Sequence, residues 1–310
     1  MDPSKTIPQY KMPDKDSPTW SHGAKKMFRY LKEPWQRRPL TEYRFEDLER
    51  YVPNESCLMP NSLASELAKL GKNRALIMHS QSAKAVAWNF FREFALSSSL
   101  LDEVVLSVEE ANTLFSRDTY EWDHDEATLK QNLHAIKCTW IAAAYSTLHS
   151  SFIRQAHTYA MVDLLPPRHL GKARSIITRV GASTYRPLNN ERMLDEMLDL
   201  ICTKAAAITN TIEASFFLWL HIAYLQPFLE GNRRTSRVVA NFPLIKAKYT
   251  PLTFTGVRIT DYQSAMIAFY ETGDVAIAAD LFEWSYRRAA EKYAGMEYWG
   301  RQSFMPQSTD

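Results

Sequence analysis

Residues 210–226 constrain the fold more than any other segment, because a helix built from them is apolar on almost every side. The apolar positions are Ile212, Ala214, Phe216, Phe217, Leu218, Trp219, Leu220 and Ile222. A helix without a polar face is buried at the centre of a protein. The stretch is too short to cross a membrane and contains His221, so it predicts a core helix.

Helical periodicity also dominates the rest of the chain, which has nine glycines and little strand-like alternation. Asn189 or Asn190 is expected to cap a helix that begins at Glu191. A further helix is expected to begin near Asn232 and to be kinked or ended by Pro243. The sequence therefore predicts the all-α class.

Residues 175–185 depart from this pattern. They are rich in β-branched side chains and are followed by Arg186-Pro187. Such a composition predicts a short hairpin or an extended flap.

Four regions follow from proline content and periodicity. The proline-dotted polar start predicts a mobile arm, and the polar, aromatic end predicts a tail. The predicted regions are an N-terminal arm (1–20), an N-terminal helical region (21–125), a helical core (126–294) and a C-terminal tail (295–310).

Composition limits the function classes. Net charge is +2 over 310 residues, which gives no argument for nucleic-acid or membrane binding. The three cysteines are Cys57, Cys138 and Cys202, and their spacing predicts neither a disulfide framework nor a zinc site. This usage fits a reducing, cytoplasmic location. A protein delivered into a host cell would have the same features.

The turn at residues 226–237 has the layout of a phosphate site. Gly231-Asn232 permits a sharp bend before a helix start, where backbone N–H groups attract anions. Arg234 and Arg237 are three residues apart and share one helix face. Glu230 offers a hard oxygen ligand for Mg²⁺. The same residues also fit an ordinary helix–loop–helix turn with solvated arginines.

Residues 226–237 resemble the signature of the Fic family, His-x-Phe-x-(Asp/Glu)-Gly-Asn-Gly-Arg-x-x-Arg. The matching positions are Phe228, Glu230, Gly231, Asn232, Arg234 and Arg237, whereas Gln226 replaces the histidine and Arg233 replaces the second glycine. The resemblance implies a Fic-type helical bundle with a short β-hairpin flap. It also implies ATP and Mg²⁺ as cofactors and transfer of AMP to a hydroxyl group of a target protein.

Residues 178–187 resemble the flap of this family, which pairs with an extended segment of the target protein. By this resemblance the docking residues are Val180, Gly181, Ser183, Thr184 and Tyr185.

Residues 98–107 resemble the inhibitory helix that many Fic proteins carry, Ser/Thr-x-x-x-Glu-(Gly/Asn). The resemblance implies that Ser98 begins the motif and that Asp102 pairs with the second arginine of the signature, with Glu103 at the glycine position. A register shifted by one residue would use Ser99 and Glu103. The segment also fits a plain acidic bend between two helices.

Two departures bear on activity. Gln226 has no basic nitrogen, so it cannot take a proton from the attacking hydroxyl. Arg233 stands where a glycine with positive φ is expected, which would cost about 1–2 kcal/mol, and its side chain either crowds the phosphates or adds a third cation. We therefore expect an impaired Fic protein that binds a nucleotide or another phosphate ligand. The alternatives are an active transferase of AMP or another phosphate-containing group, and a purely structural interaction module.

Overall fold

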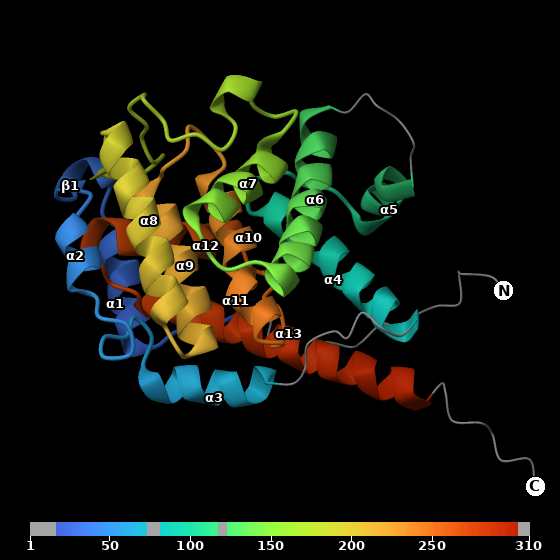
Figure 1. The fold of residues 1–310 in the computed structure, drawn as a ribbon. Helices are drawn as coiled ribbons and strands as arrows, with labels where there is room; N and C mark the ends of the chain where they lie inside the picture. The colour runs from blue at the N-terminus through green and yellow to red at the C-terminus, as the bar shows by residue number, and fades with distance from the viewer. Residues whose placement is uncertain (1–16, 73–80, 117–122, 303–310) are drawn as a thin grey trace, which may run out of the picture.

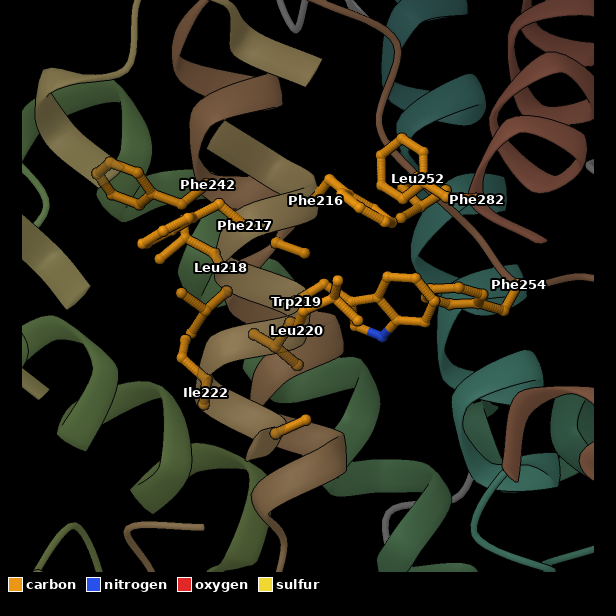
Figure 2. Packing of buried hydrophobic residues seen from close by; sticks show 14 of the residues in the cluster. Phe216, Phe217, Leu218, Trp219, Leu220, Ile222, Phe242, Leu252, Phe254 and Phe282 are labelled. Atoms are coloured by element: carbon orange, nitrogen blue, oxygen red, sulfur yellow. The ribbon is translucent and has the colours of Figure 1, made fainter. Parts of the chain in front are cut away.

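The core helix expected from the sequence is α9 (Thr211–Leu225), and every residue from Ile212 to Leu225 in it is buried. The structure is a computed structural model that describes residues 17–72, 81–116 and 123–302. Aromatic side chains of α9 point to different sides of the helix (Figure 2). Phe216 packs on Phe282 and Trp219 on Phe254, with ring centroids 5.3 and 5.2 Å apart.

The described residues form further helices before and after α9. In chain order they are α1 (His22–Leu31), α2 (Phe45–Arg50), α3 (Asn61–Gly71), α4 (Gln81–Leu100), α5 (Val108–Ser116), α6 (His124–Tyr145), α7 (Ser150–Met161), α8 (Glu191–Ala207), α10 (Asn232–Val239), α11 (Asn241–Lys246), α12 (Ile259–Thr272) and α13 (Ala276–Gln302), with 3-10 helices at Trp35–Arg37 and Pro167–His169. The all-α class is confirmed.

The helices pack in a bundle with α9 at its centre (Figure 1). Helices α3, α8, α10, α11 and α12 all pack directly against α9. Helices α6 and α7 lie against the other side of α10, and α4 packs on α6. The long helix α13 runs along one side, where it contacts α1, α3 and α12.

Helix ends follow the local sequence. Asn190 is the N-cap of α8, and its side chain accepts a hydrogen bond from the backbone N–H of Met193 at 3.1 Å, as expected. Helices α10 and α11 are separated at Ala240. Pro243 causes this break, because it lacks an N–H group and its ring would meet the carbonyl of Val239 in a continuous helix.

The flap differs from the expected hairpin. Residues 175–184 form a loop without strand, and the only pairing in the described part of this segment joins β2 (Tyr185–Arg186) to β1 (Thr41–Glu42) in parallel. The β-branched composition did not determine the pairing partner of this segment, because that partner is set by tertiary contacts rather than by local preference.

A buried carboxylate fixes the end of the flap. One oxygen of Glu271 accepts hydrogen bonds from Arg38 (2.9 Å) and from the Tyr30 hydroxyl (3.0 Å). The other accepts from the Ser183 hydroxyl (2.7 Å) and from the Thr184 N–H (2.9 Å). The side chains of Arg38 and Glu271 are 5% and 0% exposed. The N-terminal segment, the flap and α12 are therefore joined at one charged centre.

The predicted N-terminal arm and C-terminal tail are described only in part by the structure. Residues 1–16 of the predicted arm lie outside the described residues, and Trp20 packs its ring on Phe28 at 4.8 Å. Helix α13 continues past Gly295, where the tail was expected to begin, to Gln302. Across residues 17–72, 81–116 and 123–302, no helix has the length and apolar content needed to cross a membrane.

We predict that Glu271→Ala lowers the free energy of unfolding by about 3–5 kcal/mol, because it leaves Arg38 buried without a counter-ion. Urea unfolding at neutral pH measures the change. Glu196→Ala is the matched control. It removes the Arg192–Glu196 pair, whose side chains are 89% and 52% exposed, and should cost at most about 0.5 kcal/mol. Similar losses in both variants would contradict a structural role for Glu271.

Candidate functional site

The turn between α9 and α10 contains two residues with left-handed backbone. Gln226 is the C-cap of α9, with φ 51° and ψ 53°. Gly231 is the N-cap of α10, with φ 71° and ψ 10°. A Cβ atom at position 231 would overlap the Sδ and Cγ atoms of Met161. Position 231 therefore requires glycine for its backbone conformation and for space.

The start of α10 is open to a ligand. The first helical hydrogen bond runs from the Thr235 N–H to the Gly231 carbonyl at 2.8 Å. The N–H groups of Asn232, Arg233 and Arg234 precede it, and no side chain of the described residues caps the helix. Such a helix start carries partial positive charge and binds anions.

Asn232 holds the turn in shape. Its side chain accepts a hydrogen bond from the Phe228 N–H and donates one to the Phe228 carbonyl, both at 2.8 Å. The side chain is therefore engaged within the turn, and the expectation that Asn232 binds phosphate stays a prediction for its backbone. Its contribution to a ligand is confined to the backbone N–H.

His157 of α7 supports the turn, a role that no sequence pattern indicated. Its ring stacks on Phe228 with centroids 3.9 Å apart. Its Nδ1 accepts from the Gly171 N–H at 2.9 Å, so Nε2 carries the proton and donates to the Glu230 carbonyl at 3.1 Å. Burial lowers the pKa of His157 to about 4. The imidazole is therefore uncharged at physiological pH and supports the turn through its hydrogen bonds.

Arg174, also missed from the sequence, joins the flap to the turn. Its backbone N–H donates to Pro227 at 2.9 Å, and its Nε donates to the Gln226 carbonyl at 2.8 Å. Its remaining nitrogens donate to the carbonyls of Ile176 and Leu188 on either side of the flap. Arg174 thus connects both ends of the flap to the turn through its hydrogen bonds.

Asp102 bridges the two arginines of the turn. Its carboxylate accepts from Arg234 Nε at 2.7 Å and from Arg237 Nη2 at 2.8 Å. The side chain of Arg237 is fully buried and that of Arg234 is 9% exposed. Burial alone would raise the pKa of Asp102, but the guanidinium groups of Arg237 and Arg234 lower it to about 2. Asp102 is therefore ionised at neutral pH.

Ser98 completes the surroundings of Arg237. Its hydroxyl accepts from Arg237 Nε and its carbonyl from Nη2, both at 2.9 Å. The hydroxyl also donates to Asn132 at 2.9 Å. Glu103 points elsewhere and accepts from Gln263 at 3.1 Å. The arrangement is the one expected from the Ser98–Asp102 register, not from the shifted register.

A cavity of about 610 Å³ lies over the turn. The flap (178–182), the turn (229–234) and the residues Asp102, Met266 and Tyr270 line it. The exposed carboxylate of Glu230 stands in its wall. One carboxylate beside a phosphate site is a usual way to hold Mg²⁺, because the metal takes its other ligands from phosphate and water. The described residues contain no cluster of three or more metal ligands.

Arg233 does not have the strained backbone expected from the sequence. It is the second residue of α10 and its φ is not positive. The position that needs glycine is Gly231, two residues earlier. The side chain of Arg233 is half-buried and lines the cavity, so its effect is one of charge and space.

Gln226 stands at the floor of the cavity, and its carboxamide nitrogen donates to the Ala223 carbonyl at 2.6 Å. The side chain therefore caps its own helix.

His221 is no substitute base, since it lies in the core beside Phe217, and burial lowers its pKa to about 3. His124 lines the cavity as well, with a side chain that is 75% exposed and paired with Asp125.

The flap residues divide into two groups. Val180 and Gly181 line the cavity, as a docking segment would. Ser183 and Thr184 are bonded to Glu271, and Tyr185 is buried and donates from its hydroxyl to the Tyr224 carbonyl at 2.6 Å. The side chains of Ser183 and Tyr185 are thus engaged within the protein, and their assignment to target docking stays a prediction. The exposed part of the flap is 175–182.

Comparisons with known proteins agree with this geometry. The model of the Fic/DOC family matches residues 147–244. Fic-1 from C. elegans (residues 134–508) has a TM-score of 0.64 at 13% identity, over 77% of this chain and 73% of that chain. A Fic family protein from Desulfovibrio desulfuricans gives 0.62 at 16%, over 80% and 78%. A Fic domain containing signaling protein from Bacteroides thetaiotaomicron gives 0.59 at 15%, over 76% and 96%. At these identities the structural similarities show the fold.

We predict that Gly231→Ala lowers the free energy of unfolding by about 2 kcal/mol or more, because alanine disfavours φ 71° and its Cβ meets Met161. Thermal and urea unfolding measure the change. Gly181→Ala is the matched control, since a Cβ there has no atom within 4 Å, and it should change stability by less than about 0.5 kcal/mol. Equal changes in the free energy of unfolding of the two variants would contradict the requirement for glycine at position 231.

Proposed function

We propose that the chain is a Fic protein that binds a nucleotide or another phosphate ligand without base-catalysed transfer, because the model of the Fic/DOC family matches residues 147–244. Members of this family typically transfer AMP or a similar group to proteins. In this proposal the chain retains the ligand site of the family but does not carry out the family's usual transfer reaction.

The observation that carries the proposal is the state of Gln226. A carboxamide has no basic nitrogen, and this one donates to Ala223. General base catalysis typically contributes about 10²–10⁴-fold to a rate. His221 is buried in the core and does not line the cavity. Proton abstraction from a target hydroxyl therefore has no group to perform it at this position.

Ligand binding is supported by the groups that remain. The free N–H groups at the start of α10 and the side chain of Arg234 lie at one cavity, and Asp102 joins Arg234 to the buried Arg237. Arginine side chains and a helix start are the usual partners of phosphate oxygens. Glu230 would hold Mg²⁺ against the same phosphates, and the metal would neutralise their charge. ATP with Mg²⁺ is the first ligand to test.

Asp102 would restrain this binding. It occupies the guanidinium groups of Arg234 and Arg237 that a phosphate chain would contact. A phosphate chain that reaches them must break two charged hydrogen bonds of 2.7 and 2.8 Å. Hydrogen bonds to charged groups contribute about 1.5–3 kcal/mol each, so the restraint is substantial.

The partner in this proposal is a protein segment that docks on the flap. Ile176 and Ile177 are 54% and 70% exposed in a segment without helix or strand, directly before Thr178 of the cavity lining. Apolar side chains and unpaired backbone groups suit the addition of an extended peptide. With transfer lost, such docking would hold the partner rather than modify it.

We predict that Asp102→Asn increases the affinity for ATP and Mg²⁺ at least about tenfold, because it removes the charge that competes with phosphate. Isothermal titration calorimetry of the full chain measures the dissociation constant. Adding Arg237→Ala to this variant should abolish the gain. Urea unfolding of each variant checks that it is folded.

Glu103→Ala is the matched control, because it removes the neighbouring carboxylate that contacts only Gln263 among the described residues. It should change the affinity less than about twofold. A larger effect at Glu103 than at Asp102 would favour the shifted register. No ATP binding in any variant would overturn the nucleotide part of the proposal.

We predict that the wild-type chain does not label proteins of a cell lysate when supplied with ATP labelled in its α-phosphate. Gln226→His alone should also stay inactive, because Asp102 still holds both arginines. Gln226→His with Asp102→Asn should gain labelling if the missing base is the main defect. Gel autoradiography measures it, with Arg234→Ala as the background.

Labelling by the wild-type chain that disappears in Arg234→Ala would support the alternative of an active transferase. In that case His124→Ala would test whether the exposed imidazole at the cavity acts as the base.

A further inference from the structure

The segment that carries Asp102 ends α4 in a left-handed turn. The Glu103 N–H donates to the Leu100 carbonyl at 2.9 Å, and the Val104 N–H donates to the Ser99 carbonyl at 3.0 Å. These two bonds are those of a Schellman C-cap, in which position 103 is the residue with positive φ. Asp102 directly precedes that residue, so the turn sets where its carboxylate lies.

Glu103 is an unfavourable residue for this conformation. Its φ is 68°, in the region that favours glycine, and a side chain is disfavoured there. Helices that end in this way most often have glycine at the same position. The Glu103 side chain is exposed, and its hydrogen bond to Gln263 is a solvent-exposed contact. Other contacts must therefore keep the turn closed against this strain.

Asn132 of α6 supplies two such contacts. Its side chain is fully buried, accepts a hydrogen bond from the Ser98 hydroxyl and donates one to the Ser99 hydroxyl, both at 2.9 Å. The Ser99 carbonyl closes the turn, and Ser98 accepts hydrogen bonds from Arg237. One buried amide thus joins the serines that precede Asp102 to a helix that packs on α4.

We propose that Asn132 is the positioning residue of the Asp102 restraint, and that the strained backbone of Glu103 opposes it. In the closed form of the turn, Asp102 holds Arg234 and Arg237, and in the open form both arginines are free for a ligand. Loss of the Asn132 bonds shifts this balance to the open form, whereas relief of the strain shifts it to the closed form. The inference rests on the proposed function, since it names what holds and releases the carboxylate at that site.

Two substitutions test the balance from opposite sides. Asn132→Leu removes both hydrogen bonds at a similar side-chain size, so it should increase the affinity for ATP and Mg²⁺ about tenfold. Glu103→Gly relieves the strain, so it should lower this affinity about threefold. Isothermal titration calorimetry of the full chain measures both. An unchanged or lower affinity in Asn132→Leu would overturn the inference.

The direction of the change separates positioning from general stability. Damage to the fold weakens ligand binding, so a merely structural role of Asn132 predicts a loss of affinity and not a gain. Urea unfolding of each variant checks that it is folded. Glu103→Gly alters no buried side chain, so it tests the balance even where Asn132→Leu lowers stability.

Each substitution has a matched control. Gln131→Leu removes the neighbouring buried amide of α6, which donates to Asp163 at 2.9 Å instead. Glu103→Ala removes the same side chain as Glu103→Gly but keeps an L-residue at φ 68°. Both controls should change the affinity less than about twofold. Equal losses in Glu103→Ala and Glu103→Gly would assign the effect to the side chain and contradict the role of strain.

A double substitution locates the effect at Asp102. In the Asp102→Asn background the restraint is already removed, so the addition of Asn132→Leu should change the affinity less than about twofold. A further gain of about tenfold in that background would show that Asn132 acts by another route, and would contradict the inference.

Hydrogen exchange needs no ligand and therefore separates this inference from the proposed function. Mass spectrometry follows the amides of residues 97–106, whose exchange reports opening of the turn. Exchange should be about tenfold faster in Asn132→Leu and about threefold slower in Glu103→Gly than in the wild-type chain. Unchanged exchange in both variants would overturn the inference even if ATP binds. Both shifts in exchange, without ATP binding in any variant, would support the role of Asn132 and count against the proposed function.

Discussion

The arrangement of the site depends on one buried ion pair, between Arg237 and Asp102. A guanidinium without solvent exposure is tolerated only when a counter-ion and hydrogen bonds replace its water. Asp102, the Ser98 hydroxyl and the Ser98 carbonyl provide this replacement. Tyr262 adds a ring 5.4 Å from the guanidinium carbon. The end of α4 and the carboxylate that follows it are thereby fixed to α10.

Neutral groups, by contrast, shape the turn. Asn232 and His157 hold it through backbone atoms, and His157 stays uncharged because burial disfavours its protonated form. Gly231 provides the bend without a side chain. The charged side chains at the turn are therefore left to a ligand or to Asp102. This division explains how the turn keeps its shape with a carboxamide side chain at position 226.

The local sequence predicted those features whose causes are local. The apolar surface of 210–226 predicted α9, Asn190 predicted a cap, and the spacing of Arg234 and Arg237 placed them on one face. Features made by residues distant in sequence were not predictable in this way. The flap pairs with Thr41–Glu42 instead of with itself, and Arg174 reaches both the turn and the flap. The prediction of a positive φ at Arg233 was wrong, because the position of the helix start, not the residue type, sets φ there.

The hydrogen bonds of the buried Glu271 carboxylate also show which parts of the chain belong to one folding unit. The family match covers residues 147–244, yet the flap inside it is held by Arg38 and Glu271, which both lie outside. Cutting the chain at the edges of the match would leave Ser183 without its carboxylate and the flap without its anchor. The limits of a recognisable domain are thus not the limits of cooperative folding. A fragment chosen by family boundaries would retain the signature and lose the order of the segment beside it.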